Sequence, residues 1–124
     1  MFYDSIQFKA MEGSLNALSM KQEVVLTNIA NVDTPDYKVK DFNFSNVLED
    51  LCRNDSEDGK SEYRFVGSVT ERDETSTLLD GNNVDMEEQS LELYSTYLQS
   101  SAIIQKMNST IADFRYVLTQ SSFK

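Results

Sequence analysis

The stretch Asn28-Ile29-Ala30-Asn31-Val32-Asp33-Thr34-Pro35-Asp36-Tyr37-Lys38 organises the chain, because a long periodic run of apolar residues stops there. Pro35 is the only proline in the chain. A proline pushes the preceding residue out of the helical region, so we expect the N-terminal helix to end before Thr34. Asp36 then adopts either a left-handed conformation, at some cost, or a type I turn. The stretch therefore predicts a helix end followed by a turn.

Before this stretch, apolar side chains recur at alternating spacings of three and four residues. This spacing is typical of a narrow coiled-coil seam on an α-helix. Gln22 is the one polar residue in the series, and it either sets the register or is a tolerated mismatch. The apolar residues of this first seam are Phe8, Met11, Leu15, Leu18, Val25 and Ile29, and Val32 continues the series.

A second long helix is predicted after Gly81. Asp85 at its start and Glu88 three residues later fit a capping box. No proline or glycine interrupts residues 86–124. The second seam contains Leu93, Tyr97, Ile104, Met107, Ile111, Phe114 and Leu118, with Ser90 and Ser100 in matching positions. A further apolar stripe lies beside its first half and contains Leu91, Tyr94, Leu98 and Ala102. That half of the helix can therefore contact more than one neighbour.

The segment between the two helices is short, polar and acidic. Residues 42–51 predict a short helix capped by Asn43 or Ser45. Residues 53–61 have the composition of a solvated or disordered loop, and residues 63–69 contain the β-branched and aromatic side chains of a strand. A segment of this size and polarity does not form a substantial core of its own.

The predicted fold class is therefore mainly α, with two long terminal helices packed as an elongated, coiled-coil-like hairpin. We divide the chain into an N-terminal helix at 1–34, a turn and variable segment at 35–83, and a C-terminal helix at 84–124. Two such helices enclose little interior, so burying the seams within one molecule gives only marginal stability. We therefore expect both seams to pack against neighbouring subunits, and the isolated protein to be largely monomeric with weak helicity.

Composition excludes several classes of function. The chain has 124 residues and a formal net charge of −10, which argues against binding nucleic acid or anionic lipid. It contains no histidine, which removes the usual nucleophile pairs and the commonest zinc sites. Cys52 is the single cysteine, so no intrachain disulfide is possible, and a small apolar filler is the expected role.

Acidic clusters do not form a recognisable catalytic or metal site. A calcium loop centred on Gly59 would place Phe65 where a bidentate glutamate is required. Helix capping explains Asp85, Glu87 and Glu88 without any acid–base role. We therefore expect no enzyme activity, cofactor, metal or small-molecule substrate. No cleavable leader or membrane-spanning run is visible, which fits either a cytosolic protein or export without a cleavable signal peptide.

Two segments carry a family resemblance. The first resembles the N-terminal signature of the flagellar axial proteins, the family of rod and hook subunits, with Asp36 where that family usually has a glycine. The second opens the C-terminal helix and resembles the proximal-rod members of the family. The matching residues are Asn28, Ile29, Ala30, Asn31, Thr34, Pro35, Tyr37 and Lys38, then Asn82, Asn83, Val84 and Asp85.

The resemblance implies a structural subunit of the proximal rod of the bacterial flagellar basal body, a helical tube that transmits torque across the periplasm. It implies export through the flagellar type III apparatus. It also implies four kinds of partner: further copies of the chain, other rod proteins, the adaptor between rod and membrane ring, and the export apparatus. The alternative is a small acidic coiled-coil binding module, such as a secretion chaperone, which would form a stable dimer.

Overall fold

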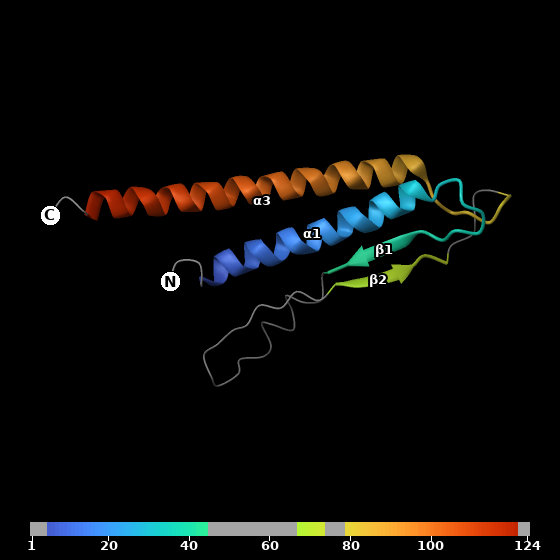
Figure 1. The fold of residues 1–124 in the computed structure, drawn as a ribbon, viewed down its shortest axis with the longest axis horizontal. Helices are drawn as coiled ribbons and strands as arrows, with labels where there is room; N and C mark the ends of the chain where they lie inside the picture. The colour runs from blue at the N-terminus through green and yellow to red at the C-terminus, as the bar shows by residue number, and fades with distance from the viewer. Residues whose placement is uncertain (1–4, 45–66, 74–78, 122–124) are drawn as a thin grey trace, which may run out of the picture.

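The computed structural model describes residues 5–44, 67–73 and 79–121. The elements in chain order are α1 (Ile6–Ala30), β1 (Lys40–Asn43), β2 (Ser68–Glu71) and α3 (Met86–Ser121). Figure 1 shows the two helices running in opposite directions along the long axis, with the strand pair beside α1. The predicted fold class, a mainly α hairpin of two long helices with a short β segment, is confirmed.

Helix α1 begins and ends where local chemistry requires it. Ser5 is the N-cap, and its side chain accepts a hydrogen bond from the backbone N–H of Phe8. The helix ends at Ala30, four residues before Thr34, as the proline predicts. The backbone N–H of Tyr37 then donates to the Thr34 carbonyl at 3.4 Å, and Asp36 has a φ of 59°. This is the geometry of a type II turn, so Asp36 adopts the left-handed conformation, the first of the two predicted alternatives.

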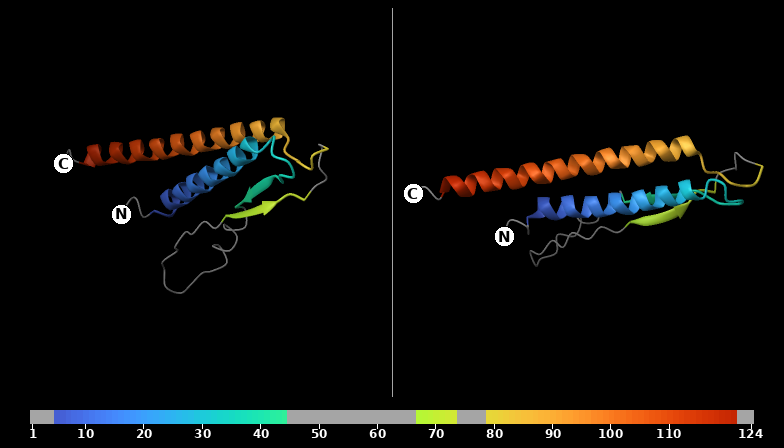
Figure 2. Two further views of the ribbon diagram at one scale, coloured as in Figure 1. Left: turned by 45° about the vertical axis from the view of Figure 1, so that its right-hand side comes forward. Right: turned by 45° about the horizontal axis from the view of Figure 1, so that its top comes forward.

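The two helices differ in length, so α3 extends beyond α1. Helix α1 has 25 residues and α3 has 36. At 1.5 Å per residue, α3 is longer by about 16 Å. Figures 1 and 2 show this excess at the C-terminal end of α3, which runs past the start of α1. The last turns of α3 therefore have no part of α1 beside them.

The contact between the helices is made by small and polar side chains as much as by large apolar ones. From α1, Ala17, Leu18 and Val25 are buried, and from α3 the buried residues are Gln89 and Thr96. Small residues let two helices approach closely, but they bury little apolar surface. The hairpin is therefore held by modest apolar packing, and its other stabilising contacts lie at one end.

The strand pair corrects two sequence predictions. Strands β1 and β2 are antiparallel, with Phe42 opposite Val69. Phe42 and the candidate cap Asn43 lie in β1, and Phe44 after them is not helical, so the predicted helix is wrong at these positions; its remainder, 45–51, lies outside the described residues. Of the strand predicted at 63–69, Ser68 and Val69 lie in β2 (Ser68–Glu71) and Gly67 does not, while 63–66 lie outside the described residues.

The reason for the first correction is a long-range contact. The side chain of Asn28 bonds both the N–H and the carbonyl of Lys40, which holds β1 extended beside α1. Phe42 is buried behind it, and a Cβ atom on Gly67 would lie 2.0 Å from the Phe42 ring. The acidic loop at 53–61, the candidate calcium loop and Cys52 also lie outside the described residues.

Candidate functional site: a polar junction and an exposed helix face

The two sequence motifs meet at one end of the hairpin, although about fifty residues separate them. We define the motif junction as residues 28–38 together with residues 81–85. The backbone N–H of Asp36 donates to the Asp80 carbonyl at 3.0 Å, and the N–H of Asn83 donates to the Tyr37 carbonyl at 3.4 Å. The Lys38 ammonium donates to the Gly81 carbonyl at 2.9 Å. The turn after α1 is thereby tied to the segment that leads into α3.

Asn28 is the centre of the junction and is completely buried. Its Nδ2 donates to the Lys40 carbonyl at 2.8 Å and to Gln89 Oε1 at 2.9 Å. Its Oδ1 accepts from the Lys40 N–H at 3.0 Å and from the Tyr37 hydroxyl at 3.1 Å. These four bonds use the full capacity of a side-chain amide. One residue of α1 therefore holds β1, the turn and α3 in place.

Asn82 is also completely buried and closes the end of α1. Its Nδ2 lies within 3.0 Å of the carbonyls of Asn31, Val32 and Thr34. Its Oδ1 accepts from the N–H of Val84 at 2.7 Å. Carbonyl groups at and just beyond a helix end lack helical partners, and a buried one left unpaired is costly. The second motif therefore supplies the hydrogen-bond donor for the carbonyl groups at and just after the end of α1.

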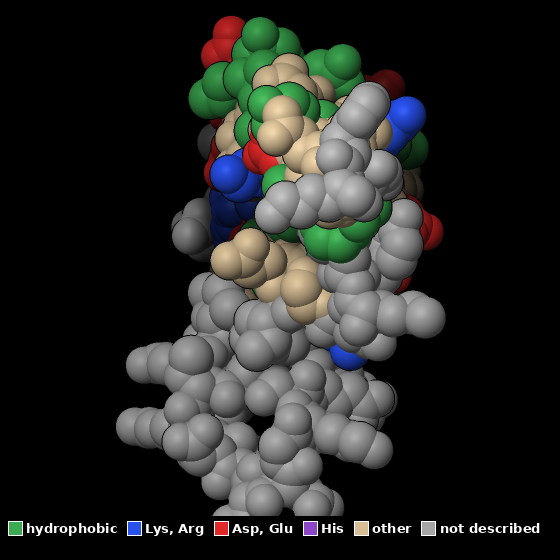
Figure 3. All heavy atoms as spheres, turned by 90° about the vertical axis from the view of Figure 1, so that its left-hand side faces the viewer, with side chains coloured by type: hydrophobic (Ala, Val, Ile, Leu, Met, Phe, Trp, Pro, Cys, Tyr) green, Lys and Arg blue, Asp and Glu red, His purple; other side chains and the backbone are tan. Residues whose placement is uncertain are grey.

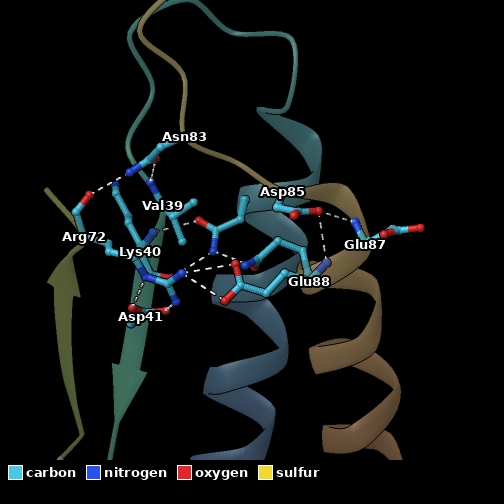
Figure 4. A network of polar contacts seen from close by, with 10 residues as sticks. Val39, Lys40, Asp41, Arg72, Asn83, Asp85, Glu87 and Glu88 are labelled. Atoms are coloured by element: carbon cyan, nitrogen blue, oxygen red, sulfur yellow. Dashed lines mark hydrogen bonds and ion pairs between the residues drawn. The ribbon is translucent and has the colours of Figure 1, made fainter. Parts of the chain in front are cut away.

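Asn83 and Asp85 hold the segment at the start of α3 through side-chain hydrogen bonds. Asn83 Oδ1 accepts from the Val39 N–H at 2.8 Å, and its Nδ2 donates to the Arg72 carbonyl at 2.9 Å (Figure 4). Asp85 Oδ1 accepts from the N–H groups of Glu87 and Glu88 at 2.8 and 3.3 Å, which confirms the predicted N-cap. The second half of the predicted capping box is wrong, because the Glu88 carboxylate binds Arg72 rather than the cap.

Arg72, the residue after β2, joins β1 and α3 through one guanidinium group. Its Nε and one terminal nitrogen contact both oxygens of Asp41 on β1 at 3.0 Å. Its other terminal nitrogen contacts both oxygens of Glu88 on α3 at 2.9 and 3.1 Å (Figure 4). These hydrogen bonds raise the pKa of Arg72 above its ordinary value. The ion pair between Lys21 and Glu92 links α1 to α3, as the hydrogen bond between Asn28 and Gln89 also does.

Two further residues of the junction, Tyr37 and Gly81, have unusual environments. Burial, and then the negative charge of Glu71, raise the pKa of the Tyr37 hydroxyl, which donates to Asn28. Gly81 has a φ of 84°, and a Cβ atom there would lie 2.3 Å from Asp36 Oδ1. Two left-handed residues therefore face each other across the junction.

The junction contains no arrangement that suggests catalysis. Its buried polar groups bond one another, and within residues 5–44, 67–73 and 79–121 no group of three or more acidic or cysteine side chains is placed to hold a metal. Neither α1 nor α3, as described, combines the length and apolar character that crossing a bilayer requires. The chemistry of the junction is that of a structural clasp, which fixes the helix hairpin.

The residues predicted to pack between subunits fall into three groups. Leu18 and Val25 are buried inside the molecule. Half-buried members are Phe8, Met11, Leu15, Ile29, Leu93, Met107 and Ile111. Exposed members are Tyr97, Ile104, Phe114 and Leu118, with exposed fractions of 61%, 49%, 41% and 52%. The view along the hairpin in Figure 3 shows hydrophobic side chains gathered over α3. An apolar face of α3 is therefore left uncovered by the chain's own α1.

Sequence reasoning missed three residues on which the site depends. Gln89 is buried against Asn28, Thr96 is buried in the helix contact, and Arg72 bridges the strands to α3. Gln89 and Thr96 lie one position before the predicted seam positions 90 and 97. Polar residues spaced seven apart were the available signal for an inward polar face, whereas nothing local to Arg72 indicates its partners.

Comparison with known proteins finds relatives along most of the chain. No family model matches. The "Flagellar basal body rod protein FlgB" of Bacillus subtilis is 34% identical over 117 residues, which cover 88% of this chain and 90% of that protein. The FlgB protein of Buchnera aphidicola is 28% identical over 90% of this chain and 92% of its own length. The FlgB protein of Escherichia coli is 26% identical over 85% of this chain and 87% of its own length.

Proposed function

Because this chain belongs to the family of the flagellar basal body rod protein FlgB, we propose that it assembles through its two helices into the wall of the rod. As a member of the family it is a structural protein of the flagellar rod and belongs in the basal body. The proposal concerns how it serves there: many copies and related rod proteins stack side by side into a helical tube, which transmits torque.

The observation that carries this proposal is the outward apolar face of α3. Tyr97, Ile104 and Leu118 are each about half exposed or more, while the inward positions of the same helix include Gln89 and Thr96. A helix that exposes its large apolar side chains and buries polar ones is incompletely satisfied as a monomer. Contacts with neighbouring subunits would cover this face and stabilise the assembled state.

We assign a separate role to each of the three segments of the chain. The helices at 1–34 and 84–124 form the packing surfaces, and the clasp, which lies where both helices meet the two ends of the segment at 35–83, sets their relative position. Partners are further copies, other rod proteins and the adaptor to the membrane ring. Delivery through the flagellar export apparatus without a cleavable signal is part of the same proposal.

The proposal is tested by complementation. A flagellated bacterium that lacks its own FlgB receives this chain, or the variants Phe114→Asp and Leu118→Asp, and isolated basal bodies are scored for incorporation. We expect the unchanged chain to be incorporated and both variants to lose most of their incorporation. The circular dichroism of the purified variants should be unchanged, which would show that they still fold. Asp113→Asn, a change to an exposed polar neighbour, is the control and should be incorporated normally. Full incorporation of both aspartate variants would contradict the proposal.

The alternative, an acidic coiled-coil binding module, makes a different prediction about stoichiometry. Such a module forms a stable dimer at low concentration, whereas a rod subunit stays monomeric until it meets other subunits. Sedimentation equilibrium of the purified chain distinguishes the two, since a tight concentration-independent dimer would favour the binding module.

A further inference from the structure

The turn before α3 contains the dipeptide Asp80-Gly81, at the edge of the motif junction. Asp80 is exposed to water, and its main-chain carbonyl accepts a hydrogen bond from the Asp36 N–H at 3.0 Å. Gly81 follows with a φ of 84°. An aspartate before a glycine is open to attack on its own side chain, because glycine has no Cβ to keep the next backbone nitrogen away from the carboxyl group.

The side chain of Asp80 is folded back along the chain. Its Oδ1 accepts a hydrogen bond at 3.2 Å from the N–H of Asn82, two residues further on. Such an Asx turn brings the carboxyl group toward the peptide nitrogen of the residue in between, which is Gly81. A donor on Oδ1 also stabilises the negative charge that develops on this oxygen when a new bond to Cγ forms. The contact with Asn82 therefore both places and activates the carboxyl group.

The backbone nitrogen of Gly81 is available for this attack. In the ranges that the structure describes, its N–H group makes no hydrogen bond to another part of the chain. The N–H groups of the next two residues are both engaged: Asn82 donates to Asp80 Oδ1, and Asn83 donates to the Tyr37 carbonyl. The nitrogen that lies next to the Asp80 carboxyl group is therefore the one that the turn leaves without an acceptor.

We propose that Asp80-Gly81 is a site of spontaneous isoaspartate formation, a covalent modification that loosens the motif junction. The Gly81 nitrogen bonds to Cγ of the protonated Asp80 carboxyl group, the nitrogen's proton leaves with the carboxyl hydroxyl as one water molecule, and a cyclic imide results. Water then opens the imide. Attack at Cγ restores aspartate, whereas attack at the former main-chain carbon gives isoaspartate. The reaction consumes no oxidant, reductant or cofactor.

The product does not fit the junction. In isoaspartate the chain runs through the side chain, so it gains one methylene group between residues 80 and 81, and the former main-chain carbonyl becomes a free carboxylate. The acceptor of the Asp36 N–H is then no longer a peptide carbonyl. Asn82, which follows Gly81, is completely buried and contacts three carbonyls at 2.8 to 3.0 Å. A displacement of the chain beside it leaves some of these buried groups unpaired, which destabilises the hairpin.

The test is ageing of the folded full chain in mildly acidic buffer, followed by peptide mass spectrometry with electron-transfer fragmentation, which distinguishes isoaspartate from aspartate. Asp85 is the matched internal control. Its Oδ1 also accepts from N–H groups two and three residues further on, but Met86 rather than a glycine follows it. We expect at least about tenfold more isoaspartate at Asp80 than at Asp85, because only Gly81 lacks a Cβ. A peptide lighter by one water, the imide, should appear first.

The variant Asp80→Glu separates this modification from other effects of ageing. A glutamate has to close a larger ring, so the variant should form little isomer while it keeps the main-chain carbonyl that Asp36 contacts. We expect the urea midpoint of the unchanged chain to fall on ageing in proportion to its isoaspartate content. The midpoint of Asp80→Glu should stay constant over the same time.

Three outcomes would overturn the inference. The first is isoaspartate at Asp80 that appears only when the chain is aged in urea, since the folded turn would then block the attack. The second is a yield at Asp80 no higher than at Asp85. The third is abundant isoaspartate at Asp80 with an unchanged urea midpoint, which would mean that the junction accommodates the product.

Discussion

Each of the four junction asparagines, Asn28, Asn31, Asn82 and Asn83, uses both ends of its side-chain amide, as donor and as acceptor. An aspartate of the same shape has no N–H to donate, and a leucine has neither group. Asn28 and Asn82 are completely buried, so any bond that they lose leaves an unpaired backbone group away from water. At the residue scale, the motif asparagines therefore act in this chain through hydrogen bonding.

The first prediction concerns the most connected of these residues. Asn28→Ala removes four hydrogen bonds and takes away the Asn28 partner of both the N–H and the carbonyl of Lys40. We expect the free energy of unfolding to fall by about 3 kcal/mol, since each buried unpaired group costs about 1–3 kcal/mol. Urea denaturation followed by circular dichroism measures this. The control is Asn43→Ala, an exposed asparagine whose one side-chain bond is 3.5 Å long; a cost as large as that of Asn28→Ala would contradict the account.

The second prediction contrasts two glycines. Gly81 has a positive φ, so Gly81→Ala should destabilise the protein by about 1–2 kcal/mol. Gly13 lies inside α1, so Gly13→Ala should stabilise it by about 1 kcal/mol. The two melting temperatures should therefore move in opposite directions. Equal shifts of the same sign would show that the left-handed conformation at Gly81 is not required.

The third prediction concerns pH. The Tyr37 pKa in the folded protein is raised above its unfolded value of about 10, so the neutral hydroxyl is favoured by folding. Its contribution is fully present below about pH 10 and is lost as the pH rises through the folded pKa. Tyr37→Phe should therefore cost about 1 kcal/mol near pH 7, through the lost bond to Asn28, and less above pH 10. A cost that is constant or grows with pH would contradict the assignment.

At the scale of elements, the helices follow from local signals, but the strands do not. Ser5, Pro35 and Asp85 fix where the helices begin and end through capping and turn chemistry that is visible in sequence. Strand β1 depends on Asn28, twelve residues away, and on a partner strand that begins at Ser68. Contacts of this range leave no periodic trace, which is why residues 42–43 were predicted as helix.

The sequence did not predict which face of α3 points toward α1, for a related physical reason. Hydrophobic periodicity identifies the most apolar stripe and assumes that it faces the nearest partner. Here the inward face includes Gln89 and Thr96, which bond the clasp or fit a close helix contact, and the apolar stripe is left outside. The sequence predicted an apolar stripe on α3 with neighbouring subunits as its partners, but it did not predict that Gln89 and Thr96 would be buried against α1.

The fourth prediction tests the link between strands and α3. Arg72→Met removes the contacts to Asp41 and Glu88, and because these side chains are partly exposed we expect a loss of only about 1 kcal/mol. Hydrogen exchange of the β1 and β2 amides should speed up more than that of α1. Arg72→Lys should not restore protection, because a lysine cannot contact both carboxylates with a planar fork. Arg115→Met, on the exposed part of α3, is the control and should leave the strand amides unchanged.

At the scale of the whole molecule, one end is tightly clasped, and at the other end α3 extends past α1 among the residues that the structure describes. The junction satisfies its polar groups internally, while α3 continues past α1 with Phe114, Val117 and Leu118 exposed. A molecule built in this way holds the angle of its hairpin without a large core, and leaves its apolar surface for other subunits. A cooperative thermal transition well above the usual range for small domains, at low concentration, would be unexpected.

The outer face of α3 is exposed in the isolated chain, and we propose that neighbouring subunits cover it in the rod. The most direct measurement is maleimide labelling of a Tyr97→Cys variant that also carries Cys52→Ser, before and after incorporation into basal bodies. We expect rapid labelling of the isolated chain and strong protection in the assembled rod. Equal labelling in both states would contradict it.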